Sequence, residues 1–241
     1  MINKSIWKFA GAIWLTAAAV APIGLASTYN ATTGFSNSSN PNGVWSYYYY
    51  DTVSSSDVLY SPATQSGTIF GLPTWINGGS IPDSLTIIQN NSGSAAGGGT
   101  ITIPNGYLNL DPEGYNVEVV FTVPSTGTYN ITGNFYGDDS DEQSHPVEVL
   151  DNGSSVYSNT ISSYEESDSF SLLSKSLNAG DKIAFFTEVG STYADLSTGL
   201  EATITSTGGT AATPEPSSLF TCAGAAALIL FLERKRRRQR A

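Results

Sequence analysis

Hydrophobic and polar residues alternate along several short stretches in the middle of this chain. In residues 128–136, Tyr129, Ile131 and Phe135 alternate with Thr and Asn, and in residues 117–123 every second position is Val or Phe. Successive side chains of a strand point to opposite faces, so each stretch predicts a strand with one apolar face. No stretch of this region shows the period of an amphipathic helix.

Similar patterns predict further strands at 44–50, 68–70, 85–89, 100–103, 147–150, 155–157, 169–173, 182–188 and 200–205. Asp151-Asn152-Gly153 joins two of them, and an Asn-Gly step favours the positive torsions of a tight hairpin. About ten strands with turns between them predict one all-β domain, an antiparallel β-sandwich over residues 27–205.

The N-terminal segment has the pattern of a signal peptide. Lys4 and Lys8 precede an apolar run that ends in small residues before Ser27. We therefore expect a signal helix in residues 1–26, export by the Sec machinery and cleavage by signal peptidase between Ala26 and Ser27. An uncleaved anchor is the alternative.

The C-terminal segment has three parts in a fixed order. Pro214, Glu215 and Pro216 precede an apolar run at 219–232, which is followed by the basic residues Arg234, Lys235, Arg236, Arg237, Arg238 and Arg240. The run predicts a short helix in the inner membrane, and basic residues beside such a helix stay on the cytoplasmic side. The central domain then faces outward, joined through a flexible linker at 206–213.

This tail, residues 214–241, resembles the PEP-CTERM sorting signal. The resemblance implies recognition by an exosortase, a membrane enzyme of bacteria that make exopolysaccharide. It further implies anchoring by the C-terminal helix before processing, and then a place at the cell surface or in the extracellular matrix of a Gram-negative bacterium.

Charge is unevenly distributed along the chain. Residues 27–216 hold 20 of the 21 acidic residues and two of the ten basic ones, a formal charge of 2 − 20 = −18. Such a surface repels nucleic acid and offers oxygen ligands to divalent cations. The single cysteine, Cys222, lies in the C-terminal apolar run, so the central domain is stabilised without a disulfide.

Four short motifs in the central region together resemble a jelly-roll module. They are Asn40-Pro41-Asn42-Gly43-Val44-Trp45-Ser46-Tyr47, Gly127-Thr128-Tyr129, Asp151-Asn152-Gly153 and Ser197-Thr198-Gly199-Leu200. The module is similar to carbohydrate-binding domains of exported bacterial proteins with the same tail. Related modules have an acidic residue directly before the last motif, where this chain has Leu196, so we give Asp195 no ligand role.

The sequence assigns no catalytic residue, and we expect a protein that is not an enzyme. His145 is the only histidine and follows an acidic loop, where we expect it to be exposed and to lack partners for a zinc site or a triad. Glu165 and Glu166 would point to opposite faces of an extended segment. We expect them in a solvated loop.

Calcium is the one metal for which the sequence offers candidates. Asp138, Asp139, Asp141 and Glu142 lie close together and supply hard oxygen ligands, although their spacing differs from that of an EF-hand. A solvated acidic loop is the more common interpretation of such a run.

Aromatic residues are the candidates for sugar binding, because a ring covers the apolar face of a pyranose. In an extended segment Trp45, Tyr47 and Tyr49 lie on one face and Tyr48 and Tyr50 on the other, so we expect one set in the core. The stacking candidates are Trp45, Tyr48, Tyr50, Trp75 and Tyr193. Most large rings belong to the core.

The resulting hypothesis is an exported, non-catalytic surface or matrix protein that is sorted by an exosortase and binds exopolysaccharide. One alternative is an exported polysaccharide hydrolase or lyase, which needs a carboxylate pair in a groove lined by aromatic residues. A second alternative is a structural matrix component without a specific ligand.

Overall fold

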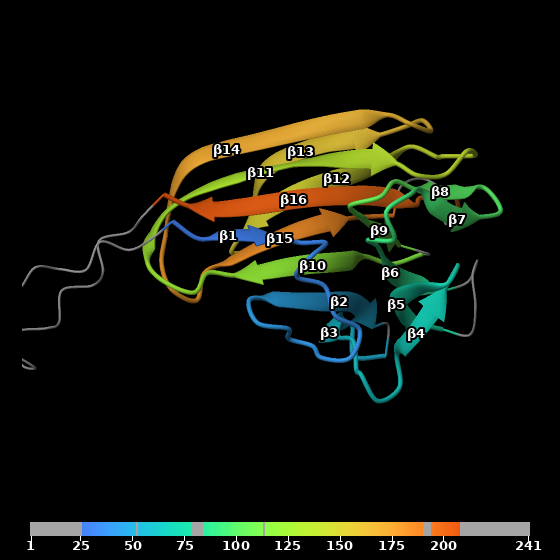
Figure 1. Ribbon diagram of the computed structural model, residues 1–241, viewed down its shortest axis with the longest axis horizontal. Coiled ribbons are helices and arrows are strands. Elements are labelled where there is room, and N and C mark those ends of the chain that lie inside the picture. The colour runs from blue at the N-terminus through green and yellow to red at the C-terminus, as the bar shows by residue number, and fades with distance from the viewer. Residues whose placement is uncertain (1–25, 52, 79–83, 113, 190–193, 208–241) are drawn as a thin grey trace, which may run out of the picture. The chain divides into compact units, whose positions relative to one another are not determined.

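The structure of the protein is a computed structural model that describes residues 26–51, 53–78, 84–112, 114–189 and 194–207. All of these residues belong to one compact unit, Gly24–Gly209. The described residues form sixteen strands and no helix. Figure 1 shows the two large sheets as the layers of a sandwich.

The larger sheet contains eight strands, and every pairing in it is antiparallel. Its spatial order is β14 (Ser167–Leu177), β11 (Gly127–Gly137), β16 (Thr198–Ser206), β9 (Tyr107–Asp111), β6 (Leu85–Asn90), β5 (Leu72–Asn77) and β4 (Ser66–Ile69), with β1 (Thr28–Asn30) on β16.

The second large sheet contains six antiparallel strands. Its order is β13 (Ser154–Ile161), β12 (His145–Asp151), β15 (Lys182–Thr187), β10 (Val117–Thr122), β2 (Trp45–Asp51) and β3 (Ser56–Leu59). A separate hairpin joins β7 (Ala96–Gly98) to β8 (Ile101–Ile103). The predicted antiparallel sandwich is therefore confirmed.

Each strand predicted from alternation is present, and five more were missed. The missed strands are β1, β3, β5, β7 and β9. They have three to six residues each, so their patterns are too short to separate from loops.

The predicted hairpin at Asp151–Gly153 is confirmed. Asn152 and Gly153 have φ values of 49° and 80°, the left-handed torsions that an Asn-Gly step favours. The turn joins β12 to β13, which pair from Asp151 and Ser154 outward.

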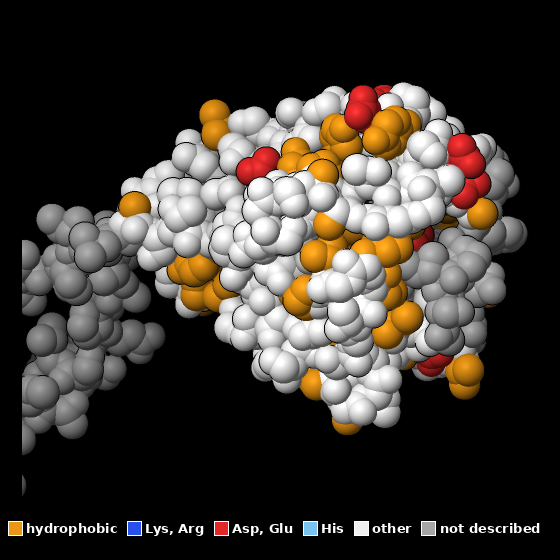
Figure 2. All heavy atoms as spheres, turned by 45° about the vertical axis from the view of Figure 1, so that its right-hand side comes forward, with side chains coloured by type: hydrophobic (Ala, Val, Ile, Leu, Met, Phe, Trp, Pro, Cys, Tyr) orange, Lys and Arg blue, Asp and Glu red, His pale blue; other side chains and the backbone are white. Residues whose placement is uncertain are grey.

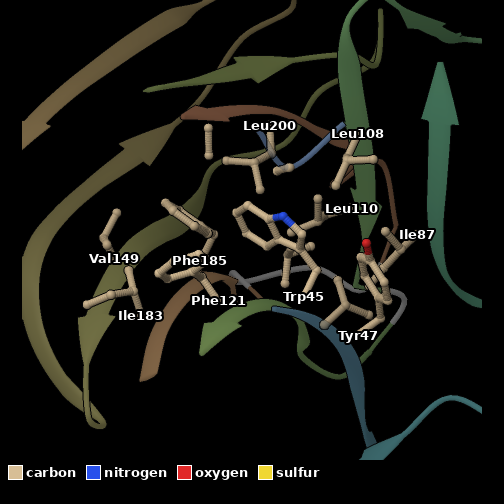
Figure 3. Close-up of a cluster of buried hydrophobic side chains, with 14 of the residues drawn as sticks. Trp45, Tyr47, Ile87, Leu108, Leu110, Phe121, Val149, Ile183, Phe185 and Leu200 are labelled. Carbon is tan, nitrogen blue, oxygen red and sulfur yellow. The ribbon is translucent and has the colours of Figure 1, made fainter. Parts of the chain in front are cut away.

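The main core lies between the two large sheets and is rich in aromatic rings. Figure 3 shows the Trp45 ring beside Phe121 and Phe185, with ring centroids 5.3 and 6.4 Å away. Trp75 stacks on Tyr60 with a centroid separation of 5.8 Å. Disulfide-free packing of this kind supplies the burial that stabilises the sandwich.

The prediction that two of these core residues stack on sugar rings is wrong. Trp45 and Trp75 are 2% and 0% exposed, so neither ring presents a face to a ligand. The expected division of the tyrosine run is confirmed, because Trp45 and Tyr47 are buried and the half-buried Tyr49 packs against the same core, whereas Tyr48 and Tyr50 are half-buried on the opposite face.

A small second core lies on the outer face of the eight-stranded sheet. Ile101 and Ile103 of the β7–β8 hairpin pack with Leu72 and Ile88 of β5 and β6. The hairpin thus covers part of that face.

The predicted signal helix, membrane helix, sorting motif and basic tail lie outside the described residues. Within the part of the chain that the structure describes, no helix is long and apolar enough to cross a membrane.

Candidate functional site

A groove lies on the outer face of the six-stranded sheet. Its volume is about 530 Å³. Its lining combines rings, a small apolar floor, amides, two carboxyl groups and one lysine: Tyr48, Asp57, Asn116, Glu118, Val120, Leu150, Asn152, Gly153, Lys182, Ala184 and Phe186. We call these residues the groove.

Strand register explains why residues so distant in sequence line one groove. Glu118 of β10 lies directly between Tyr48 of β2 and Phe186 of β15. In the parallel row, Ala184 lies between Val120 and Leu150. Neighbouring strands are about 4.8 Å apart, so a floor across four strands extends roughly 14 Å.

Four aromatic residues of this face lie in the groove or beside it, and they differ in exposure. Tyr48 and Phe186 are half-buried in the groove. Beside it, Tyr50 stacks on Tyr115 with ring centroids 5.8 Å apart, and Tyr115 is 45% exposed. Of the five predicted stacking residues, the structure places Tyr48 in the groove and Tyr50 next to it, while Tyr193 lies outside the described residues.

The groove holds a carboxyl pair that the sequence does not show. The pKa of Glu118 is raised to about 7, first by burial and then by the charge of Asp57 and a hydrogen bond to its side chain, against the opposing effect of Lys182. Two carboxyl groups form a hydrogen bond only when one of them carries a proton. The pair therefore shares a proton near neutral pH.

Lys182 is the single cation of the groove. Its Nζ lies 5.8 Å from the centroid of the Tyr48 ring, within the range of a cation–π contact. Among the described residues, the salt bridge between a lysine and a carboxylate joins Lys175 and Asp151, so Lys182 forms none with Asp57 or Glu118.

The predicted calcium residues lie in a different region, at the end of β11. Asp138, Asp139 and Glu142 are 0%, 3% and 8% exposed, whereas Asp141 is exposed. The expectation of a solvated acidic loop is therefore wrong for three of the four residues. We call Asn109, Asp138, Asp139, Glu142 and His145 the buried polar cluster.

Asp138 lies against the backbone of β16 and pairs with an amide. Nδ2 of Asn109 donates to Oδ2 of Asp138 at 3.1 Å, and Oδ1 of each residue has no hydrogen-bond partner among the described residues. A Cβ added at Gly199 would lie 2.9 Å from Oδ1 of Asp138, so a larger residue at this position would force the carboxyl group to shift. Burial raises the pKa of Asp138 well above its ordinary value.

His145 is fully enclosed, which corrects the expectation of an exposed loop histidine. Its Nδ1 lies 2.9 Å from the carbonyl oxygen of Gln143, and its Nε2 contacts the hydroxyl of Thr198. A carbonyl only accepts, so Nδ1 carries the proton and Nε2 of the neutral ring accepts from Thr198. Burial lowers the pKa of His145.

Two of the predicted calcium ligands, Asp139 and Glu142, accept hydrogen bonds from backbone N–H groups of their own loop. The Asp139 carboxylate accepts from the Asp141 backbone N–H at 2.9 Å and from the Thr100 hydroxyl at 3.1 Å. Glu142 accepts from the Asp139 N–H at 3.1 Å. Among the described ranges, no group of three or more His, Cys, Asp or Glu side chains is arranged to hold a metal. Calcium binding by these four residues stays a prediction.

Two carboxyl pairs of the described residues, Glu165 with Glu166 and Asp57 with Glu118, differ from the geometry of a glycosidase. Glu166 accepts hydrogen bonds from Ser162, which lower its pKa, and the exposed Glu165 has a φ of 61° in the turn before β14. Asp57 and Glu118 are in direct hydrogen-bond contact. Glycosidases separate their two carboxyl groups by at least about 5 Å to admit the sugar.

The comparisons with known proteins found no matching family model and no matching curated protein. Among solved structures, the K1 cleaved adhesin domain of Lys-gingipain from Porphyromonas gingivalis W83 is similar with a TM-score of 0.43 and 12% identity, over 75% of this chain and 98% of that chain. TmCBM61 in complex with β-1,4-galactotriose gives 0.32 and 16%, over 55% and 87%.

A third similar structure is the CBM36-1 domain of a multidomain xylanase from the hindgut metagenome of Trinervitermes trinervoides. Its TM-score is 0.31 with 14% identity, over 49% of this chain and 94% of that chain. At these scores the likenesses carry no argument about function, which must come from the residues of this chain.

Sequence reasoning missed most of the groove. Glu118 was recognisable as an outward-facing residue, because it alternates with Val117 and Val119. Asp57 and Phe186 come from strands far away in the sequence. Their meeting at Glu118 depends on strand order and register, for which the sequence has no local signal.

Proposed function

We propose that this protein is an exported, non-catalytic surface or matrix protein that binds polysaccharide along the groove of its six-stranded sheet. The observation that carries the proposal is the cross-strand row of Tyr48, Glu118 and Phe186, which places two rings on either side of a carboxyl group. Sugar rings have apolar faces and polar edges, and this row offers a partner to each.

The remaining groove residues suit the same ligand. Asn116 and Asn152 offer amides to hydroxyl groups, and the small side chain of Ala184 keeps the floor low. A floor of roughly 14 Å is longer than one sugar ring, so the groove suits a chain of sugars. The hydrogen bond between Asp57 and Glu118 leaves no space for a glycosidic bond between them, which supports binding without hydrolysis.

The test is a polysaccharide array probed with the full-length protein and two variants. Tyr48→Ala removes a ring from the groove, and Tyr164→Ala removes a 38% exposed ring from the turn before β14. We expect reproducible glycan binding that Tyr48→Ala reduces about tenfold, as the loss of one stacked ring predicts, and that Tyr164→Ala leaves unchanged. Equal loss in both variants would contradict a site in the groove.

The same samples separate the two alternatives. Release of new reducing ends or unsaturated products from a bound polysaccharide would establish a hydrolase or lyase. Absence of any reproducible glycan would favour a structural matrix component and overturn the proposal.

We propose export and sorting on the strength of the two chain ends. Pro214, Glu215 and Pro216 with the apolar run and basic tail support processing by an exosortase, after transient anchoring in the inner membrane. Cleavage between Ala26 and Ser27 fits the sandwich, because the Ser27 backbone N–H donates to Ser206 at 2.8 Å and so begins the β1–β16 pairing. We also propose that the sandwich is of the jelly-roll class.

Replacement of Pro214, Glu215 and Pro216 by alanine tests the sorting. We expect the variant to stay in the membrane fraction of an exosortase-bearing host, whereas the unaltered protein reaches the surface or the medium. Equal distribution of both would overturn the sorting proposal and leave the groove unaffected.

Calcium is the second ligand that we propose, at the predicted residues Asp138, Asp139, Asp141 and Glu142. Oδ1 of Asp138 and Oε1 of Glu142 are buried without a hydrogen-bond partner in the described residues, and a buried carboxyl group needs a proton or a cation. Carboxyl oxygens are hard donors of the kind calcium prefers. We expect calcium to raise the unfolding temperature of the protein but not of its Asp138→Asn variant. An equal response, or none, would contradict calcium binding at Asp138.

A further inference from the structure

The carboxyl pair of the groove distinguishes it from a neutral sugar site. Asp57 and Glu118 come from β3 and β10, which flank β2, and both line the groove, where the two side chains are hydrogen-bonded to each other. Hydroxyl groups of a neutral sugar can donate to a carboxylate, but they cannot replace the proton that the pair shares, because they carry no charge. A ligand ammonium group can do so.

We infer that the groove selects polysaccharides with free amino groups, whose ammonium group takes the place of the proton between Asp57 and Glu118. This inference rests on the proposed function and names the class of sugar that the same site prefers. In the exchange the pair releases its proton to solvent and gains two charge-assisted hydrogen bonds from one N–H₃⁺ group. No covalent bond changes.

The charges around the pair support a cationic ligand. Lys182, the only cation among the described residues that line the groove, opposes such a ligand, but it is outnumbered by Asp57, Glu118 and Glu148, the last of which follows Phe186 in the same cross-strand row as Glu118. Residues 27–216 together carry a formal charge of −18. On the face drawn in Figure 2, where Lys182 of the groove cannot be seen, Asp and Glu side chains are visible, so acidic side chains also lie on the surface away from this lysine. This field attracts cationic chains and repels uronic acid polymers.

A matched pair of ligands tests the inference. An oligomer of β-linked glucosamine and the N-acetylated oligomer of the same length differ only in the charge of the amino group. We expect the full-length protein at about pH 6 to bind the amine form about tenfold more tightly, the increment of a charge-assisted hydrogen bond. A polyuronate should bind more weakly than either.

Matched variants separate the pair from general charge attraction. Glu118→Gln and Asp57→Asn each remove one carboxyl group from the groove with little change of shape, and Glu165→Gln removes one from the exposed turn before β14. We expect the first two to bring the ratio of the affinities for the two oligomers close to one, and the third to leave it unchanged. An equal decrease in all three variants would assign the preference to net charge and overturn the inference.

Proton release provides a readout that a merely structural role of the pair would not produce. Calorimetric titrations in two buffers with different ionisation enthalpies measure protons released on binding. We expect release with the amine oligomer and none with the N-acetylated one, and no release from Glu118→Gln.

If both oligomers bind equally and without proton release, the amine preference is wrong while polysaccharide binding in the groove stands. If neither oligomer nor any other glycan binds, the proposed function fails as well.

Discussion

The groove and the buried polar cluster both hold carboxyl groups with raised pKa values, yet they differ in what surrounds them. In the groove, Glu118 shares a proton with Asp57 at a surface that a ligand can reach. In the cluster, Asp138 and Glu142 are buried. Asp138 accepts a hydrogen bond from the Asn109 amide, and Glu142 accepts one from the Asp139 backbone N–H. The first arrangement suits recognition, and the second holds a loop in place.

This difference shows that the burial of acidic residues cannot be predicted from the sequence when the segment has no periodic pattern. The run from Asp138 to Glu142 has the composition of a solvated loop, and the structure buries three of its four acids. Glu118, by contrast, lies in a regular strand and reaches the surface. Strand periodicity assigns a face to each residue, but a loop has no such period.

The largest effect that we expect is on the cluster, from His145→Ala. The change removes a buried ring and the partner of the Gln143 carbonyl, and it leaves the Thr198 hydroxyl with the Leu196 carbonyl, 3.3 Å away. We expect a loss of about 3 kcal/mol in the free energy of unfolding, measured by denaturant titration. The control Asp141→Asn, at the exposed position of the same loop, should change stability by less than about 0.5 kcal/mol. Equal effects would show that the cluster does not hold the loop.

A second effect concerns the alkaline side of the pH profile. Burial raises the pKa of Glu142 to about 9. The hydrogen bond from the Asp139 backbone lowers this pKa, and the charges of Asp139, Asp138 and Asp111 raise it by smaller amounts. The folded state then binds more protons than the unfolded state, so stability is complete below the ordinary carboxyl pKa and falls as pH rises toward 9. We expect a decrease of about 2 kcal/mol between pH 7 and pH 9 from this residue.

Thermal unfolding at several pH values measures this decrease. Glu142→Gln should reduce the slope of the profile above pH 7, where His145 no longer titrates because burial lowers its pKa, while Asp138, whose pKa burial also raises, keeps its own contribution. A profile that rises with pH in the unaltered protein would contradict the assignment.

The smallest effect distinguishes the groove from the cluster by its pH range. The pKa of Glu118 is raised only to about 7, through burial and Asp57, so its contribution to stability is lost as pH rises through 7 rather than through 9. After allowance for partial exposure, we expect the difference in unfolding free energy between the protein and Glu118→Gln to change by about 1 kcal/mol from pH 5 to pH 8. A difference that stays constant over this range would mean that Asp57 and Glu118 share no proton.

The sequence predicts the elements of this fold better than their assembly. Tyr129, Ile131 and Phe135 point into the core as alternation requires, and Asn152-Gly153 forms the expected turn. The same rule correctly assigned the aromatic residues at 45–50 to the two faces of the strand. Which face would be buried depended on the opposing sheet, so the assignment of Trp45 to sugar binding was wrong.

The candidate site was less predictable than the fold, for a physical reason. Tyr48 was identified from its chemistry alone, whereas Asp57, Glu118 and Phe186 acquire their role only when β3, β2, β10 and β15 lie side by side. A shift of one residue in any of these pairings would move the side chain to the opposite face. Local patterns hold no information on that register.

The most direct test of the central claim is a map of the bound polysaccharide on the protein. Amide chemical shifts of the isotope-labelled full-length protein, recorded with and without a glycan found on the array, report which backbone groups the ligand perturbs. The account predicts that the perturbed amides lie in β2, β10 and β15 around Tyr48, Glu118 and Phe186, and that those around His145 do not change. Perturbation centred on the buried polar cluster, or on any surface away from the six-stranded sheet, would contradict it.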